Sequence, residues 1–403
     1  MQKLLTILFL SLAFLGIGQT GNFWTKLNDF GGLKRERAVA FTIGDKAYAG
    51  TGVDTAEIVH NDFWEYDPMT DAWTQVANLP ASVRRNAIAF AINDKGYVGT
   101  GIDSSEASAF GSSTLSDFWS YDAALNTWTQ KANFPGGNGN GIYFATAFSI
   151  GNFGYVCGGK RGPNQYVDDF WRYDPNLDQW TQLQDFPGGV RYQLCSFVIG
   201  NTAYVGLGTD QDLYRKDLWA YNDITDQWTP RNDFPASERA STMTFTIGQK
   251  GYICMGANGG ILDDLWEYNP FADTWLSRAT YGGSSRKNAI SFSLLGKGYV
   301  GTGKGYSGKK SSMHVYTPIG FAGIDEHTVE VTIAPNPTTD WIQLTYDDPR
   351  IAHIELYSMD GKRLFSEKKV TKVDVSNYTS GTYMLLVKTS DHTLLSSQKI
   401  IVE

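Results

Sequence analysis

The chain has 403 residues, enough for two or three domains that each bury a full core. Its formal net charge of −8, together with the absence of any basic block, argues against nucleic acid as a partner. Aromatic residues make up 14% of the chain, which also contains 43 glycines, and this composition favours many short strands and tight turns over a helical protein.

The first residues indicate a secretory signal peptide. Lys3 precedes an apolar run from Leu4 to Leu15, and the small residues Gly16 and Gly18 follow it. This run is shorter than the roughly 20 residues that a membrane-spanning helix needs. We therefore expect residues 1–18 to be removed, and we expect no transmembrane anchor in the mature chain.

Two blocks of sequence then recur along most of the chain. Five segments between Asp62 and Trp275 share the pattern D-[FL]-W-x-Y-[DN]-x-x-x-[DN]-x-W. The second block, F-x-I-x-x-x-x-Y-x-x-x-G, occurs six times, with Leu for Ile in the last copy. Its tyrosines are 49, 58, 49, 48 and 47 residues apart, at Tyr48, Tyr97, Tyr155, Tyr204, Tyr252 and Tyr299. A period near 50 with about four short strands is typical of a β-propeller blade.

The sixth unit is incomplete, and the N-terminus supplies what it lacks. His314 replaces the first Trp of the pattern, and no second Trp follows. At the other end of the repeats, Trp24 lies 49 residues ahead of Trp73. We expect the N-terminal strand to complete the sixth blade and close the ring, because closure removes exposed sheet edges. The prediction is an all-β, six-bladed propeller over residues 19–320.

These repeats resemble the kelch family, whose units of about 50 residues carry a strand-ending Gly pair and a late Trp. Here the pair is varied to Gly-Thr-Gly, Gly-Gly or Gly-Leu-Gly, and the resemblance covers about Asn22 to Pro318. It implies the kelch β-propeller of the galactose oxidase superfamily. Eleven of the twelve tryptophans belong to the repeat, and we interpret them as packing between blades.

In a propeller, the loops before the first strands meet on one face, where ligands bind. Six residues lie four positions before the first-strand Phe of each unit, and we expect them to line the mouth of the central channel: Arg37, Asn86, Phe144, Gln193, Ser241 and Asn288. Such a set suits a polyhydroxylated or acidic ligand. The alternative is a water-filled channel whose polar groups satisfy one another. Secondary candidates for ligand contact are Glu238, Arg239, Lys304 and Lys309.

Two positions further upstream, Arg recurs in five of the six units, and Ile142 is the exception. This repetition favours a structural role, in which each guanidinium binds loop carbonyls or the acidic residue at a strand start. The five residues are Arg35, Arg84, Arg191, Arg239 and Arg286.

Signatures of catalysis and of cofactor binding are sparse. The propeller contains only two histidines, so a multi-histidine copper site like that of the galactose oxidases is not supported. GKGYSGKK, from Gly303 to Lys310, comes within one residue of a phosphate-binding loop, but it leads into a strand and not a helix. We predict no catalytic residues, no cofactor and no metal.

After a linker at residues 321–330, residues 331–403 alternate apolar and polar side chains as strands do. Asp360-Gly361 between two such runs predicts a hairpin. A segment of this size and pattern indicates a small β-sandwich.

This tail looks like the C-terminal sorting domain of the type IX secretion system. The motifs that carry the resemblance are APNPTTDW from Ala334, MDGKRL from Met359, VDVSNYTSGTYMLLV from Val373 and the ending KIIVE. The resemblance implies recognition by the type IX secretion machinery and export across the outer membrane. The alternative is an ordinary sandwich module that binds carbohydrate.

The leading hypothesis is a kelch propeller that is secreted or held at the outer cell surface of a Gram-negative bacterium, where its channel mouth binds a glycan or a protein. The alternative is an enzyme, a sugar mutarotase or epimerase of the sialic-acid mutarotase type. Its acid, base and cationic groups would come from Glu36, Arg37, Glu238 and Arg239.

Overall fold

The computed structural model describes residues 21–103, 114–136, 140–162, 164–210, 213–319, 331–346, 351–358, 363–388 and 394–403. The expected signal peptide, the linker at 321–330 and the Asp360-Gly361 turn lie outside these residues. The chain divides into two compact units, one of Asn22–Pro318 and one that contains Ile319–Glu403. The described residues form strands and turns without a helix, so none of them belongs to a helix that could cross a membrane.

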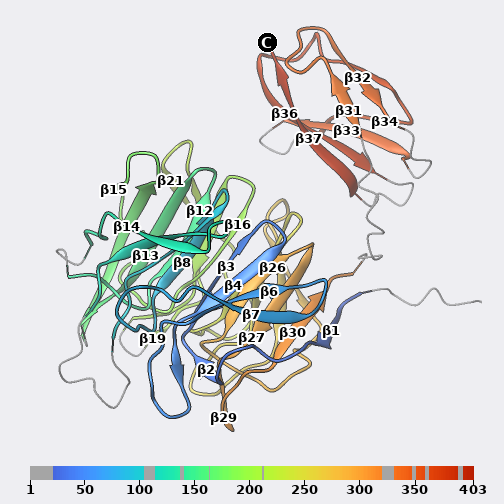
Figure 1. Ribbon diagram of the computed structural model, residues 1–403. Helices are drawn as coiled ribbons and strands as arrows, with labels where there is room; N and C mark the ends of the chain where they lie inside the picture. The colour runs from blue at the N-terminus through green and yellow to red at the C-terminus, as the bar shows by residue number, and fades with distance from the viewer. Residues whose placement is uncertain are drawn as a thin grey trace, which may run out of the picture. The chain divides into compact units, whose positions relative to one another are not determined.

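Within Asn22–Pro318, the described residues form six four-stranded antiparallel sheets (Figure 1). The first sheet contains β3 (Val39–Ile43), β4 (Lys46–Gly50), β6 (Phe63–Asp67) and β7 (Ala72–Val76). The second contains β8 (Ile88–Ile92), β9 (Lys95–Gly99), β10 (Phe118–Asp122) and β11 (Thr127–Lys131). The third contains β12 (Thr146–Ile150), β13 (Phe153–Gly162), β14 (Gln165–Asp174) and β15 (Gln179–Gln182).

The remaining sheets follow the same order, except that the sixth takes its last strand from the N-terminus. The fourth sheet contains β16 (Cys195–Ile199), β17 (Thr202–Gly206), β20 (Leu218–Asn222) and β21 (Gln227–Arg231). The fifth contains β22 (Met243–Ile247), β23 (Lys250–Cys254), β24 (Leu265–Asn269) and β25 (Thr274–Arg278). The sixth contains β26 (Ile290–Leu294), β27 (Lys297–Gly301), β30 (Met313–Thr317) and β1 (Phe23–Lys26). Short two-stranded sheets pair β2 (Arg35–Glu36) with β5 (Val53–Asp54), β18 (Thr209–Asp210) with β19 (Leu213–Tyr214), and β28 (Lys304–Gly305) with β29 (Gly308–Lys309).

The first strand of each sheet contacts the first strands of two other sheets. Along the chain, β3 contacts β8, β8 contacts β12, β12 contacts β16, β16 contacts β22 and β22 contacts β26. The series returns to its start, because β26 contacts β3. The N-terminal strand β1 pairs antiparallel with β30, with Trp24 opposite Tyr316.

Aromatic rings packed against small residues hold neighbouring sheets together. Phe41 of β3 stacks on Tyr48 of β4, with ring centroids 5.5 Å apart. The Phe41 ring also covers Gly96 of the second sheet, where an added Cβ would come within 2.1 Å of the ring. Phe90 covers Gly154 of the third sheet in the same way. The Phe of one sheet therefore packs directly on the small residue of the next sheet. A larger residue in place of that Gly would push the two sheets apart.

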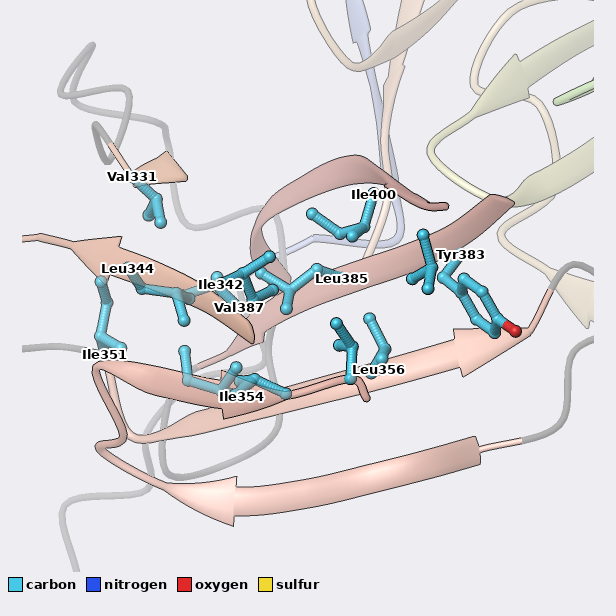
Figure 2. Packing of buried hydrophobic residues seen from close by; sticks show 13 residues of the cluster. Val331, Ile342, Leu344, Ile351, Ile354, Leu356, Tyr383, Leu385, Val387 and Ile400 are labelled. Atoms are coloured by element: carbon cyan, nitrogen blue, oxygen red, sulfur yellow. The ribbon is translucent and has the colours of Figure 1, made fainter. Parts of the chain in front are cut away.

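The second unit contains two sheets that share one core. The three-stranded sheet consists of β31 (Thr332–Ala334), β32 (Trp341–Thr345) and β35 (Lys372–Asp374), and the four-stranded sheet of β34 (Arg363–Lys368), β33 (His353–Ser358), β36 (Gly381–Lys388) and β37 (Leu394–Val402). Figure 2 shows Ile342 and Leu344 of the first sheet packed with Ile354, Leu356 and Leu385 of the second. All five side chains are at most 1% exposed.

The PNP motif of this unit binds its last strand. The Nδ2 of Asn336 donates to the carbonyl of Lys399, and its Oδ1 accepts from the backbone N–H of Ile401, at 2.8 Å in both cases. The PNP motif near the start of this unit is thus hydrogen-bonded to the last strand, β37.

Candidate functional site

The six residues expected at the channel mouth lie together and form a closed cycle of backbone hydrogen bonds. The N–H of Arg37 donates to the carbonyl of Asn288 at 2.9 Å, and the N–H of Asn86 donates to the carbonyl of Arg37 at 3.1 Å. Phe144, Gln193, Ser241 and Asn288 continue the cycle, with each N–H donating to the carbonyl of the preceding member. We call these six residues the mouth ring.

Every member of the mouth ring has a positive φ, between 53° and 61°. This left-handed conformation is uncommon for residues other than glycine. It is compatible here with the position of each residue in the cycle, where backbone hydrogen bonds to two other sheets hold it. Because the backbone groups bond one another, the side chains supply the chemistry that the ring offers.

These side chains surround a cavity of about 130 Å³. The guanidinium of Arg37 lies over the ring of Phe144, 5.2 Å from its centroid. Asn86 is 7% exposed, and its Nδ2 has no hydrogen-bond partner among the residues that the structure describes. A buried amide donor without a partner costs free energy, about 1–3 kcal/mol, unless a ligand or water accepts from it. Arg37 and Phe144 therefore line the cavity together with Asn86, whose unsatisfied donor is buried in the wall.

A buried carboxylate lies behind the mouth ring. Glu36 is 2% exposed, and its Oε2 accepts from the Nδ2 of Asn288 at 2.9 Å. The Nε of Arg37 lies 3.7 Å from the same oxygen. Glu36 thus holds two members of the mouth ring in place.

The GKGYSGKK segment forms the hairpin β28–β29 and leads into β30. The Nζ of Lys309 is buried and donates to Glu57 Oε1 at 2.6 Å and to the carbonyl of Asp54 at 2.7 Å. Lys304 is more exposed, and its Nζ lies 3.9 Å from Glu36 Oε1. Neither lysine lines the mouth cavity. No helix follows the loop, so the arrangement that binds phosphate in a P-loop is missing at this segment.

The recurring arginines work inside the sheets. Arg239 is 1% exposed and donates to Asp264 and to the carbonyl of Met255. The same contacts, to the acidic residue at the third strand and to a carbonyl after the second, occur at Arg35, Arg84 and Arg191. Glu238, which precedes Arg239 in the chain, is exposed and does not line the mouth cavity.

In the third sheet, Arg161 takes the role of the recurring arginine. Ile142 stands at the usual position, and Asp169 pairs with Arg161 at 2.6 Å. In the sixth sheet Arg286 remains, and it donates to Ser312, which occupies the place of the acidic residue.

Beyond the mouth ring, small side chains of the first strands line a second cavity of about 370 Å³. The residues three positions after the ring members are Ala40, Ala89, Ala147, Ser196, Thr244 and Ser291. The polar members bond one another, since Thr244 Oγ1 donates to the carbonyl of Ser196 and Ser291 Oγ to that of Thr244. The hydroxyl groups of this second cavity therefore have backbone acceptors.

A cluster of tyrosines next to the ring was not predicted. Tyr143 and Tyr192 directly precede ring members in the chain, and their rings surround Lys160 together with Tyr166. Burial lowers the pKa of Lys160 below its usual value. Adjacency to the mouth positions was the signal that could have found two of these residues.

Comparisons with known proteins identify both parts of the chain. Residues 34–190 match the KLHDC2/KLHL20/DRC7 Kelch-repeats domain, and residues 332–403 match the Secretion system C-terminal sorting domain. Kelch-like protein 21 of Danio rerio is 30% identical over 86 residues, which are 21% of this chain and 13% of that protein's length.

The solved structure of YjhT has the same fold as the first unit. It superposes with a TM-score of 0.60 at 15% sequence identity and covers 72% of this chain and 99% of its own. The match to the sorting domain implies export by a secretion system. The chain therefore joins a kelch-repeat domain to a secretion-system C-terminal sorting domain.

Proposed function

We propose that this chain is an exported propeller that binds a glycan at its mouth ring. The six sheets are its blades, β1 closes the ring, and residues 19–320 form the propeller. The cyclic contacts of the first strands and the pairing of β1 with β30 support closure.

The observation that carries the binding proposal is the mouth cavity with the unsatisfied amide of Asn86. Side chains from six sheets meet there, and they offer amide, hydroxyl and guanidinium groups beside the aromatic face of Phe144. Sugars bind to such mixtures, in which hydroxyl groups pair with polar side chains and C–H faces pack on aromatic rings. A cavity of about 130 Å³ admits the end of a glycan chain more readily than the surface of a folded protein.

A glycan array with the full mature chain tests this function. Arg37→Ala should weaken any glycan signal about tenfold or more, because a hydrogen bond from a charged group is worth roughly 1.5–3 kcal/mol. Asn86→Ala should weaken it about two- to tenfold, because a neutral hydrogen bond is worth roughly 0.5–1.5 kcal/mol. Trp341→Ala, in the other unit, should leave the signal unchanged. A chain that binds no glycan, or whose glycan binding ignores both ring variants, would rule the proposal out.

Catalysis of sugar mutarotation or epimerisation is the second candidate function. It is supported by the buried carboxylate of Glu36, which lies beside the mouth ring and could act as an acid or base. Of the other groups that this function would use, Arg37 lies 3.7 Å from Glu36, but Glu238 is exposed and Arg239 is bonded inside its sheet. NMR exchange between sugar anomers, compared for the wild type and Glu36→Gln, separates the two functions. Exchange above the spontaneous rate that the variant abolishes would establish the enzyme.

For export, we propose a signal peptide at residues 1–18, a linker at 321–330 and a sandwich at 331–403 that the type IX secretion machinery recognises. The two-sheet core of Figure 2 supports the sandwich. The destination is the medium or the outer cell surface of a Gram-negative bacterium. Deleting residues 324–403 should leave the propeller inside the cell, and its appearance outside would contradict the assignment.

A further inference from the structure

The ammonium of Lys160 lies among three tyrosine rings beside the mouth ring. Its Nζ is 4.6 Å from the ring centroid of Tyr192, 5.0 Å from that of Tyr166 and 5.7 Å from that of Tyr143. Tyr166 and Tyr192 stack on each other, with centroids 5.2 Å apart and an interplanar angle of 17°. Lys160 and Tyr166 pair across β13 and β14, which have ten residues each and extend this hairpin beyond the five-residue length of most strands.

Among the described residues, nothing provides an acceptor for this ammonium. Lys160 is partly buried. Two other lysines with little-exposed side chains have a carboxylate partner: Lys309 pairs with Glu57, and Lys388 pairs with Glu355. Such pairing compensates the hydration that a charge loses on burial. The hydroxyls of Tyr143 and Tyr166 also lack a hydrogen-bond partner among the residues that the structure describes. The ammonium and the two hydroxyls are thus all able to donate to a ligand.

This cluster is continuous with the mouth cavity through Phe144. The Phe144 ring contacts Tyr143, with centroids 5.4 Å apart, and Tyr192, with centroids 5.8 Å apart. On its other side, Phe144 carries the guanidinium of Arg37. An aromatic surface therefore runs from the mouth cavity to Lys160.

We infer that Lys160, Tyr143, Tyr166 and Tyr192 form a second subsite, which binds the carboxylate of an acidic sugar unit. The inference rests on the proposed glycan-binding function and specifies its ligand as a uronate-containing chain. One sugar unit occupies the mouth cavity, the chain passes over Phe144, and the next carboxylate accepts from Lys160 and the tyrosine hydroxyls. Aromatic faces suit the C–H faces of pyranose rings, and a charged donor suits a carboxylate. An acidic peptide would use the charge but not the flat aromatic surface.

The test uses the full mature chain and oligosaccharides in matched pairs. The probes are hexamers of galacturonic acid and of hyaluronan, each as the free acid and as the methyl ester, and a hexaglutamate peptide. Isothermal titration should show at least one acid form binding about tenfold or more tightly than its ester, since a charge-assisted hydrogen bond is worth roughly 1.5–3 kcal/mol. The peptide should bind more weakly than that acid.

Variants assign the effect to the subsite. Lys160→Met should lower the affinity for the acid to that for the ester and leave the affinity for the ester unchanged, while Lys160→Arg should keep the preference for the acid. Lys250 is the matched control, because burial lowers its pKa as well, and it lies at the start of β23 among neither the mouth nor the tyrosine residues. Lys250→Met should preserve both affinities.

The outcomes separate the two proposals. Equal affinity for acid and ester, an acid preference that survives in Lys160→Met, or tighter binding of the peptide would overturn the subsite and leave the mouth ring as a glycan site. A chain that binds neither these probes nor a neutral glycan would overturn both.

Discussion

The Tyr281 hydroxyl and Nδ1 of His314 share a hydrogen bond of 2.8 Å, in a buried contact of the sixth sheet. Most other sheets have a Phe and a Trp at these places, as in the pair of Phe30 and Trp64. The polar pair fills the space of an apolar one, and its ring centroids lie 4.8 Å apart. Burial, followed by the charges of Arg286 and Lys26, lowers the pKa of His314 to about 4.

This pair predicts a loss of stability in mild acid. Above pH 6.5 His314 is neutral in both states. As the pH falls below 6.5 the unfolded chain binds a proton that the folded chain refuses, so the free energy of unfolding should drop by about 2 kcal/mol between pH 7.5 and 5. Urea unfolding across this range measures the slope. His314→Phe should be less stable at pH 7.5, because it orphans the Tyr281 hydroxyl, but its pH slope should be smaller. An unchanged slope would contradict the assignment.

The second prediction concerns Trp24, a half-buried residue of β1 whose removal should strongly lower the stability of the first unit. Trp24 Nε1 donates to the carbonyl of Ala279 at 3.1 Å, and Asn22 Oδ1 accepts from the N–H of Ala279 at 2.8 Å. Trp24→Ala should reduce the free energy of unfolding of the propeller by about 3 kcal/mol, since it opens the contact between the fifth and sixth sheets. Chemical denaturation checks this value. Trp341→Ala, with a Trp that is 39% exposed in the other unit, should not shift the propeller transition.

The arginines differ in burial and should differ in cost. The Arg239 side chain is 2% exposed where it pairs with Asp264, whereas that of Arg161 is 28% exposed where it pairs with Asp169. Arg239→Met removes the donor to the Asp264 carboxylate and to the buried carbonyl of Met255, so it should cost about 3 kcal/mol. Arg161→Met removes only the more exposed guanidinium that pairs with Asp169, so it should cost less, about 1 kcal/mol. Equal losses in thermal and urea unfolding would show that burial does not set the cost.

The sequence predicts the repeating parts of this molecule well because their contacts repeat. The tyrosine period locates the second strands, and the orphan Trp24 indicates the strand that pairs with β30. The mouth ring residues could also be predicted, because each lies four positions before the first-strand Phe of its unit and the six units place this position alike.

Other features of the molecule were missed for physical reasons. The positive φ of Phe144 and Gln193 follows no residue preference. The environment of Lys160 depends on the lengthened hairpin of the third sheet, which no other unit shows among the described residues. Lys309 was a candidate for ligand contact, but its partner Glu57 is 252 residues away in the chain, and only the folded structure brings them together.

That long-range pair gives the last prediction. The Lys309 side chain is 5% exposed and bonds Glu57 and the carbonyl of Asp54, so it joins β29 of the sixth sheet's loop to the first sheet. Lys309→Met should cost about 3 kcal/mol, because it leaves the buried carbonyl of Asp54 without its donor and removes the cation 3.9 Å from the buried carboxylate of Glu36. The matched control is Lys304→Met in the same hairpin, whose side chain is 43% exposed and 3.9 Å from Glu36, and it should cost about 1 kcal/mol or less. Urea unfolding measures both, and a glycan titration of the two variants adds a second readout. If Lys309→Met weakened binding while leaving stability intact, the lysine would be a ligand contact after all and its structural role would be wrong.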